Sequence, residues 1–110
     1  MINKNFVAVN YIDCKPEYIA RFEELFGSRA KQIDTMPGFV DMQVLRPSKA
    51  GDAYLIISHW ENEDAFTGWT KSETFLEGHK RGFADIAQAK REGKESPMKS
   101  DFKTYEVIAR

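Results

Sequence analysis

The chain has 110 residues, of which 42% are hydrophobic and 30% are charged. This length and composition predict one globular domain spanning residues 1–110. Sixteen basic residues against seventeen acidic ones give a net charge of −1. That balance argues against nucleic acid as the main partner, because binding to phosphate backbones usually needs a basic surplus.

Cysteine content and hydropathy also bound the class of protein. Cys14 is the only cysteine, so no disulfide can form within the chain. No segment approaches the ~20 apolar residues that a membrane span needs, and the first residues lack the apolar run of a signal peptide. We therefore expect a cytoplasmic protein without a membrane partner.

The first expected elements are a strand and an amphipathic helix. Apolar β-branched and aromatic residues alternate over residues 6–12, which is typical of a strand buried on both faces. Asp13 is expected to cap a helix that begins near Pro16, where the fixed φ of proline suits the first turn. Apolar residues then recur at steps of three and four, namely Ile19, Phe22, Phe26, Ala30 and Ile33.

A hairpin is expected next. Residues 39–45 alternate as a strand, and residues 53–60 form the most apolar strand of the chain. The turn-rich connector over residues 46–52 predicts that the second of these strands returns antiparallel to the first.

The remaining chain predicts helices followed by a last strand. Asn62 is expected to cap one helix, and Ser72 a further helical segment. The polar stretch Asp85–Asp101 is expected to be a long loop or a fraying helix end that could close over a ligand. Residues 102–109 then read as the final strand.

This order predicts an α+β fold of the ferredoxin-like βαββαβ class, with one antiparallel sheet and helices on one face. Several strands are apolar on both faces, so a second copy packed sheet against sheet would cover the other face. The expected assembly is therefore a homodimer that forms a dimeric α/β barrel. The alternative is a monomer whose outer face is only partly apolar.

His79 is the first candidate for chemistry, because imidazole is the commonest protein ligand of haem iron and other transition metals. Trp69 lies ten positions earlier, about 80° away in projection on a continuous helix. Both could face one cavity, although a break near Ser72 would change that geometry. The alternatives are an exposed surface histidine and a tryptophan that belongs to the core.

Asn10 is the third candidate, since an amide in the middle of an apolar strand goes against strand propensity. The alternative is an asparagine that satisfies a backbone group at a bulge. The other histidine, His59, lies in a strand, and we expect it to be structural. Motifs for zinc and nucleotides (CxxC, HExxH, Walker loop, GxGxxG) are absent from the sequence, and no flavin or nucleotide site is indicated.

With these residues in view, the sequence resembles the antibiotic-biosynthesis-monooxygenase-like dimeric α/β barrels. Within them it is most similar to the IsdG-type haem-degrading monooxygenases. The resemblance covers nearly the whole chain, through VAVNYI, MPGFVDMQVL, HWENEDAF, FTGW-TKSETF-LEGHK and ESPM.

The resemblance implies a role for each candidate. His79 would be the proximal ligand of haem iron, Asn10 would hydrogen-bond near the distal oxygen site, and Trp69 would help to distort the porphyrin. Haem would be both substrate and oxygen-activating cofactor, an external electron donor would supply electrons, and ring opening would release iron. Lys80, Arg81 and the basic residues of the late loop are candidates for pairing with the propionates.

Two other functions stay open on the sequence. One is a cofactor-independent monooxygenase of the same superfamily that oxidises an aromatic substrate. The other is a non-enzymatic haem-binding protein.

Overall fold

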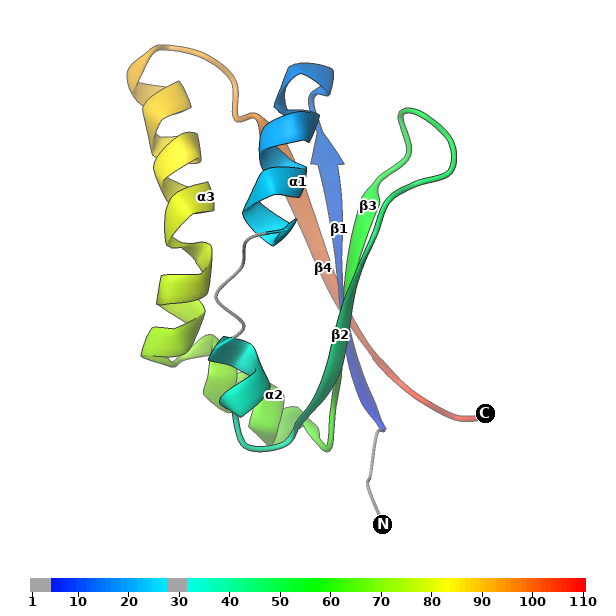
Figure 1. Ribbon diagram of the computed structural model, residues 1–110. Coiled ribbons are helices and arrows are strands. Elements are labelled where there is room, and N and C mark those ends of the chain that lie inside the picture. Colours follow the sequence, from blue (N-terminus) through cyan, green and yellow to red (C-terminus); the bar gives the residue numbers. More distant parts are fainter. Residues whose placement is uncertain (1–4, 28–31) are drawn as a thin grey trace.

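The computed structural model describes residues 5–27 and 32–110. It contains one antiparallel sheet of four strands, with the helices on one face (Figure 1). The strands are β1 (Phe6–Cys14), β2 (Phe39–Leu45), β3 (Tyr54–Trp60) and β4 (Met98–Glu106), in the spatial order β2-β3-β1-β4. The predicted ferredoxin-like fold with a single antiparallel sheet is therefore confirmed.

The helices are α1 (Ile19–Gly27), α2 (Glu63–Thr70) and α3 (Glu73–Arg91), with short 3-10 turns at Pro16–Tyr18 and Gln32–Thr35. Two of the predicted caps are confirmed. The Asn62 side chain accepts a hydrogen bond from the Ala65 backbone N–H at 2.8 Å, and the Ser72 hydroxyl accepts one from the Phe75 backbone N–H at 3.2 Å. Each cap satisfies a backbone donor that the first helical turn leaves unpaired.

The predicted Asp13 cap is wrong. Asp13 is part of β1 and pairs with Lys99 of β4, so the strand continues two residues beyond the predicted end. The residue before the 3-10 turn is Lys15, whose side chain makes no capping hydrogen bond. Pairing with β4, which is remote in sequence, decides this boundary.

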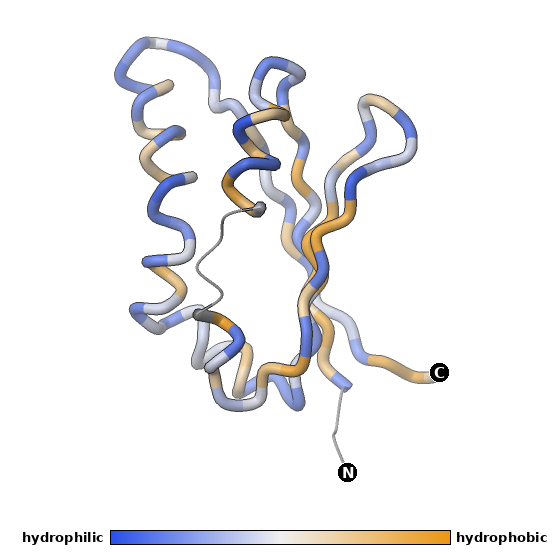
Figure 2. Tube along the Cα trace, viewed as in Figure 1, coloured by the Kyte–Doolittle hydropathy of each residue, from blue (hydrophilic) through white to orange (hydrophobic). Residues whose placement is uncertain are grey.

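Of the two alternatives predicted for Asp85–Asp101, the long loop is wrong, and a helix end is confirmed as far as Arg91. Helix α3 continues to Arg91, and β4 begins at Met98, so only residues 92–97 connect them. This end of α3 is rich in polar residues, as Figure 2 shows. A polar stretch can still be helical here because no α3 residue has to be fully buried. Lys90 and Arg91 in the last turn also suit the negative end of the helix dipole.

The predicted stripe of the first helix is confirmed in part. Phe22 is fully buried, but Ile19 is 36% exposed. Ile33 is buried too, but it belongs to the 3-10 turn Gln32–Thr35 and not to α1, and Ala30 lies outside the described residues. Ile19 is exposed because the 3-10 turn Pro16–Tyr18 changes the phase of the helix, so Tyr18 and Phe22 occupy the inner positions and pack with Ile12 and Tyr54. A second cluster is centred on Trp60, which is fully buried against Phe6 and Phe66.

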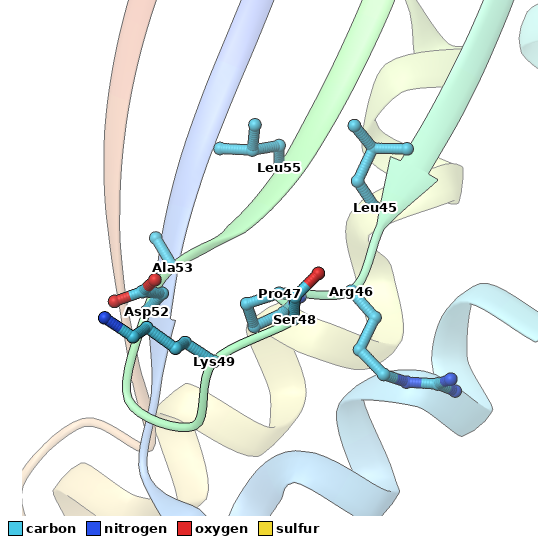
Figure 3. Close-up of a pocket in the computed structure, with 8 residues that line it drawn as sticks. All are labelled: Leu45, Arg46, Pro47, Ser48, Lys49, Asp52, Ala53 and Leu55. Carbon is cyan, nitrogen blue, oxygen red and sulfur yellow. The ribbon is translucent and has the colours of Figure 1, made fainter.

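The β2–β3 hairpin is tied to α1 at one end of the sheet. Arg46 donates to both carboxylate oxygens of Glu23, and the Tyr54 hydroxyl donates to the same carboxylate. These hydrogen bonds, chiefly those from Arg46, lower the pKa of Glu23 to about 2. Figure 3 shows Arg46 reaching toward the helix, away from a small open hollow of about 490 Å³ under the hairpin turn.

The outer face of the sheet carries an apolar centre without a helix over it (Figure 1). The strand register places Val9 beside Ile57, and Tyr11 beside Leu55, on this face. Leu45 and Tyr105 at the edges of this face are 39% and 45% exposed. Within the described residues, no helix is long and apolar enough to cross a membrane.

Gly38, just before β2, allows α2 to approach the sheet closely. Its φ is +79°, a region that side chains other than glycine rarely adopt, and a Cβ there would overlap the Cβ of Ala65. Gly51 also has a positive φ, +95°, but a Cβ there would meet nothing within 4 Å.

We therefore predict that Gly38→Ala lowers the free energy of unfolding more than Gly51→Ala does. Both variants bear the backbone strain, and only Gly38→Ala adds a clash, expected to cost about 1–3 kcal/mol more. Urea unfolding of the two variants beside the wild type measures the difference. Equal losses in the two variants would contradict this packing at Gly38.

Candidate active site

A cavity of about 650 Å³ lies between the inner face of the sheet and the helices. This volume is within the range of about 300–1,000 Å³ that is usual for small-molecule sites. Most of the lining is apolar or aromatic, and all three helices and all four strands contribute to it. The three candidates from the sequence, Asn10, Trp69 and His79, all line this one cavity.

Trp69 and His79 meet although the helix that carries them is broken. Helix α2 ends at Thr70 and α3 begins at Glu73, with Ser72 capping the new helix. The rings of Trp69 and His79 nevertheless lie 5.9 Å apart between centroids. Their proximity therefore depends on the capped turn between two helices and not on the phase of a single one.

The His79 ring is held in one tautomer. Its Nδ1 lies 2.7 Å from the backbone carbonyl oxygen of Phe75, and a carbonyl can only accept, so Nδ1 carries the proton. The Nε2 atom then keeps its lone pair. This is the usual arrangement of a histidine that binds a metal, because the second hydrogen bond sets both ring orientation and basicity.

Aromatic neighbours also restrict the His79 ring. Phe75 stacks on it with centroids 4.1 Å apart, and Phe83 stacks with centroids 5.5 Å apart. The three residues lie four positions apart on one face of α3. That spacing is visible in the sequence and could have identified the aromatic flanks of the histidine.

Trp69 presents a buried donor without a protein acceptor. Among the described residues, its Nε1–H is the one buried side-chain polar atom that has no hydrogen-bond partner. Its ring packs 5.6 Å from Trp60 and 4.9 Å from Phe75, between centroids, so it belongs to the core and to the cavity wall at once. A buried unpaired N–H is costly, so Trp69 is a lining residue whose donor the described protein leaves unsatisfied.

Asn10 faces the cavity from the centre of the sheet. Its Oδ1 accepts a hydrogen bond of 2.6 Å from the Ser100 hydroxyl. The pairing of β1 with β3 and β4 is regular through Asn10, so the alternative of an asparagine at a bulge is wrong. Sequence reasoning missed Ser100, because the position of β4 relative to β1 cannot be read from local pattern.

The second histidine, His59, has a structural role, as expected, and so has the second tryptophan, Trp60. His59 lies on the outer face, where its Nδ1 is 2.7 Å from a carboxylate oxygen of Asp41, its neighbour on β2. Trp60 is fully buried, and its Nε1 donates to the Ser58 hydroxyl at 2.9 Å. Neither His59 nor Trp60 lines the cavity.

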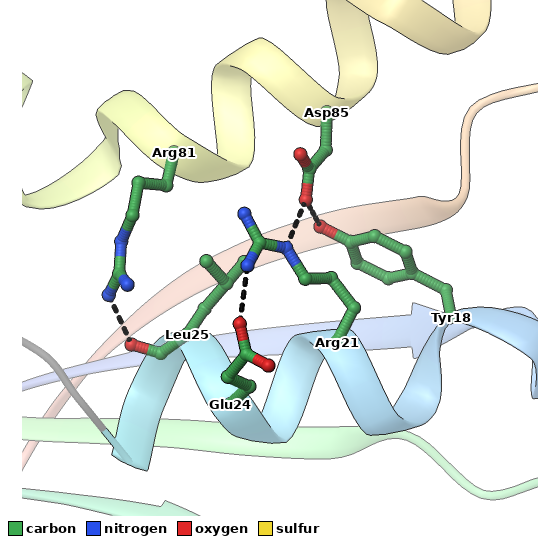
Figure 4. Close-up of polar contacts among 6 residues, drawn as sticks. All are labelled: Tyr18, Arg21, Glu24, Leu25, Arg81 and Asp85. Atoms are coloured by element: carbon green, nitrogen blue, oxygen red, sulfur yellow. Dashed lines mark hydrogen bonds and ion pairs between the residues drawn. The ribbon is translucent and has the colours of Figure 1, made fainter.

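A group of polar contacts, also missed in the sequence, ties α3 to α1 across one side of the cavity (Figure 4). Asp85 accepts from the Tyr18 hydroxyl at 2.7 Å and from Arg21 Nε at 2.9 Å. Arg81 donates to the Leu25 carbonyl at 3.0 Å. Burial alone would raise the pKa of Asp85, but the hydrogen bonds from Arg21 and Tyr18 outweigh it and hold the pKa below its ordinary value.

The basic residues that were candidates for pairing with a ligand's carboxylates lie at different distances from the cavity lining. Arg81 lines the cavity, whereas Lys80 does not. Lys94, in the connector to β4, pairs with Glu92 at 3.5 Å. In the described ranges, no three His, Cys, Asp or Glu side chains gather into a metal site.

Comparison with known proteins gives a family match over most of the chain. The profile of the family described as "Antibiotic biosynthesis monooxygenase" matches residues 5–81. A Mycobacterium tuberculosis protein named "Heme oxygenase (mycobilin-producing)" is 35% identical over 63 residues, which are 57% of this chain and 60% of that protein. A Bacillus cereus "Heme-degrading monooxygenase" is 35% identical over 54 residues, 47% of this chain and 50% of that protein. The matches thus span only about half to three fifths of these relatives.

Solved structures agree with the fold. The heme-degrader MhuD of M. tuberculosis, with two hemes bound in its active site, superposes with a TM-score of 0.68 at 25% identity, over 96% of this chain and 97% of that one. SnoaB, a cofactor-independent oxygenase from Streptomyces nogalater, superposes with a TM-score of 0.69 at 23% identity, over 97% and 96%. The SnoaB likeness concerns the fold alone.

The tie between α1 and α3 leads to a prediction about stability. Replacing Asp85 by Ala removes the acceptor of two hydrogen bonds, so we expect the free energy of unfolding at pH 7 to fall by about 1–3 kcal/mol. Because the pKa of Asp85 is lowered in the folded protein, its contribution is present above the ordinary value of 3.8 and is lost as the pH falls below it.

Urea unfolding at pH 7 and pH 3 measures this effect, and the gap between wild type and Asp85→Ala should narrow at pH 3. Glu77→Ala is the matched control, since it removes an exposed carboxylate from the same helix. A gap that stays constant, or a control that loses as much stability, would contradict the assigned role of Asp85.

Proposed function

Because the chain belongs to the antibiotic biosynthesis monooxygenase family, we propose that it is a haem-degrading monooxygenase. It would bind haem, open the porphyrin ring with O₂ and electrons from an external donor, and release iron. The observation that carries the proposal is the state of His79, with Nδ1–H bonded to the Phe75 carbonyl and Nε2 available on the wall of an apolar cavity.

The residues that line the cavity fit haem in shape and polarity. A flat apolar macrocycle suits walls made largely of aromatic and aliphatic side chains. The single available imidazole nitrogen suits an iron whose other ligands come from the macrocycle itself. The 35% identity to proteins named as a heme oxygenase and a heme-degrading monooxygenase supports the same choice.

Each candidate then has a distinct task. His79 Nε2 would hold the iron, and the stacked Phe75 and Phe83 rings would restrict the swing of the imidazole. Trp69 would press on the macrocycle and help to distort it, while its N–H finds an acceptor. Asn10 would donate a hydrogen bond from β1, near the site where O₂ reacts. The haem supplies the iron centre that activates O₂.

Charge at the cavity suits the carboxylates of the ligand. Arg81 lines the cavity and already donates to the Leu25 carbonyl. A guanidinium has five N–H donors, so Arg81 can keep this bond and pair with a propionate as well. Lys80 and the basic residues near β4 would be secondary partners.

The working assembly would be a homodimer in the form of a dimeric α/β barrel. The apolar centre of the outer face, with Ile57 and Val9 at its middle, is the surface that a second copy would cover. Two-fold symmetry would bring the apolar centre of one subunit against the same apolar centre of its partner.

A second candidate function has a specific observation in its favour. The N–H groups of Trp69 and Asn10 face one apolar cavity, and they could bind the oxygen of a phenolic substrate without any metal. The family description favours this reading as well. It gives no role to the lone pair of His79 Nε2, which is why haem is preferred.

Titration with haemin tests the proposal. The wild-type protein should develop a Soret band at one haem per subunit, and the band should decay with iron release when ascorbate is added in air. Catalase must be present, because free peroxide bleaches haem without specific catalysis. A band that persists would indicate a haem carrier, and turnover of a phenolic substrate without haem would support the second candidate.

The two histidines provide a matched pair of variants for the same titration. His79→Ala should weaken haemin binding by more than about tenfold, as expected when a metal ligand is lost. His59→Ala removes an imidazole from the outer face and should bind like the wild type. Unchanged binding by His79→Ala would overturn the assignment of the ligand.

Sedimentation analysis tests the dimer. Ile57→Lys buries a charge in the middle of the proposed interface and should convert the protein to monomers at micromolar concentration. Leu76→Lys is the matched control, because Leu76 is 60% exposed on α3, away from that face, and should leave the dimer intact. A wild-type protein that sediments as a monomer would refute the barrel.

A further inference from the structure

The orientation of the Asn10 amide depends on a residue of the neighbouring strand. In the register of β1 and β4, Asn10 pairs with Phe102, and Ile12 pairs with Ser100. Ser100 is thus the diagonal neighbour of Asn10 on the inner face, a separation that short polar side chains can bridge. The Ser100 hydroxyl makes a 2.6 Å hydrogen bond to Asn10 Oδ1, and both residues line the cavity.

The two ends of an asparagine amide have similar shapes and opposite hydrogen-bonding properties. If Oδ1 faces a ligand, the residue accepts; if Nδ2 faces it, the residue donates. The Ser100 hydroxyl occupies Oδ1, and among the described residues Asn10 Nδ2 has no hydrogen-bond partner. The NH₂ end is therefore the one available to a ligand.

Few other neighbours can fix the orientation of the Asn10 side-chain amide. Its backbone pairs without interruption on both sides, so the strand sets the position of Cβ but not the flip of the amide. Ile12 and Ala8, the next inward-facing residues on β1, are aliphatic and offer no hydrogen bond. Ser100 is the described side chain that restrains the amide, and in this arrangement its hydroxyl donates to Oδ1.

We infer that Ser100 is a positioning residue, which holds Asn10 with its NH₂ group toward the bound ligand. The donor toward the ligand is then a Ser100–Asn10 pair, and without the serine hydroxyl the amide loses its one described side-chain hydrogen bond and is free to rotate. This inference rests on the proposed function for its catalytic consequence, but the pairing itself exists in the protein without haem.

The C–O stretching frequency of the ferrous haem–carbon monoxide complex provides a readout other than turnover. An N–H that donates to the oxygen of carbon monoxide lowers this frequency. Ser100→Ala should raise it toward the value of Asn10→Ala, and Ser100→Thr, which keeps a hydroxyl in a strand, should restore it. The rate of haem degradation in Ser100→Ala should fall about fivefold, as expected for one hydrogen bond.

Two comparisons make the test specific. Thr104→Ala removes a hydroxyl from the same strand and the same face, pairs with Ala8, and does not line the cavity, so it should leave frequency and rate unchanged. In the Asn10→Ala background, Ser100→Ala should have no further effect, because a positioning residue acts only through its target. A shift that persists in that background would overturn the inference.

A measurement without haem separates this inference from the proposed function. The side-chain amide resonances of Asn10, identified by their loss in Asn10→Ala, can be followed by ¹⁵N NMR of the ligand-free protein. They should move in Ser100→Ala and stay near the wild-type position in Ser100→Thr and Thr104→Ala. If they do not move in Ser100→Ala, the pairing is refuted, whether or not the protein degrades haem.

Discussion

The structure depends on how α3 is held, because this helix forms one wall of the cavity without burying any residue completely. Its start is fixed by the Ser72 cap, two residues after α2 ends. Farther along, Asp85 binds Tyr18 and Arg21, and this joins the helix to α1. A helix packed tightly on the sheet would be more stable but would fill the cavity. The hydrogen bonds of Asp85 at the edge of the cavity hold α3 apart from the sheet, and the cavity between them remains open for a ligand.

The position of α3 brings together side chains whose hydrogen-bonding or metal-binding groups are only partly used within the protein. His79 uses one ring nitrogen for the Phe75 carbonyl and retains the other. Trp69 has a buried N–H without an acceptor, and Asn10 has its carbonyl end occupied by Ser100. The three side chains that carry these groups line the same apolar space. Polar groups without a protein partner are common at functional sites. Here the groups without a protein partner are the ones proposed to contact the ligand.

Local patterns predicted the parts of the fold that local interactions decide. Strands β2 and β3, the connector after Leu45 and the caps at Asn62 and Ser72 follow from alternation, turn residues and side-chain acceptors. The last strand was predicted over residues 102–109, but β4 is Met98–Glu106, because its bounds follow from pairing with β1. The cap at Asp13 and the loop over Asp85–Asp101 were wrong because distant partners decide those boundaries, through pairing with β4 and through the ties to α1. Ser100 could not be found from the sequence, since its neighbour depends on the register of two strands about 90 residues apart. Asn10 was singled out because an amide is unusual in an apolar strand, and His79 because imidazole is the commonest protein ligand of haem iron; the structure places both, with Trp69, on one cavity.

The central claim is that His79 presents Nε2 to the iron of haem in this cavity. The resonance Raman spectrum of the ferrous haem complex tests it most directly, through the stretching band of the iron–histidine bond. The account predicts this band in the wild type and in His59→Ala, its absence in His79→Ala, and its return when imidazole is added to that variant. A band that is unchanged in His79→Ala, or a wild-type complex without one, would contradict the account.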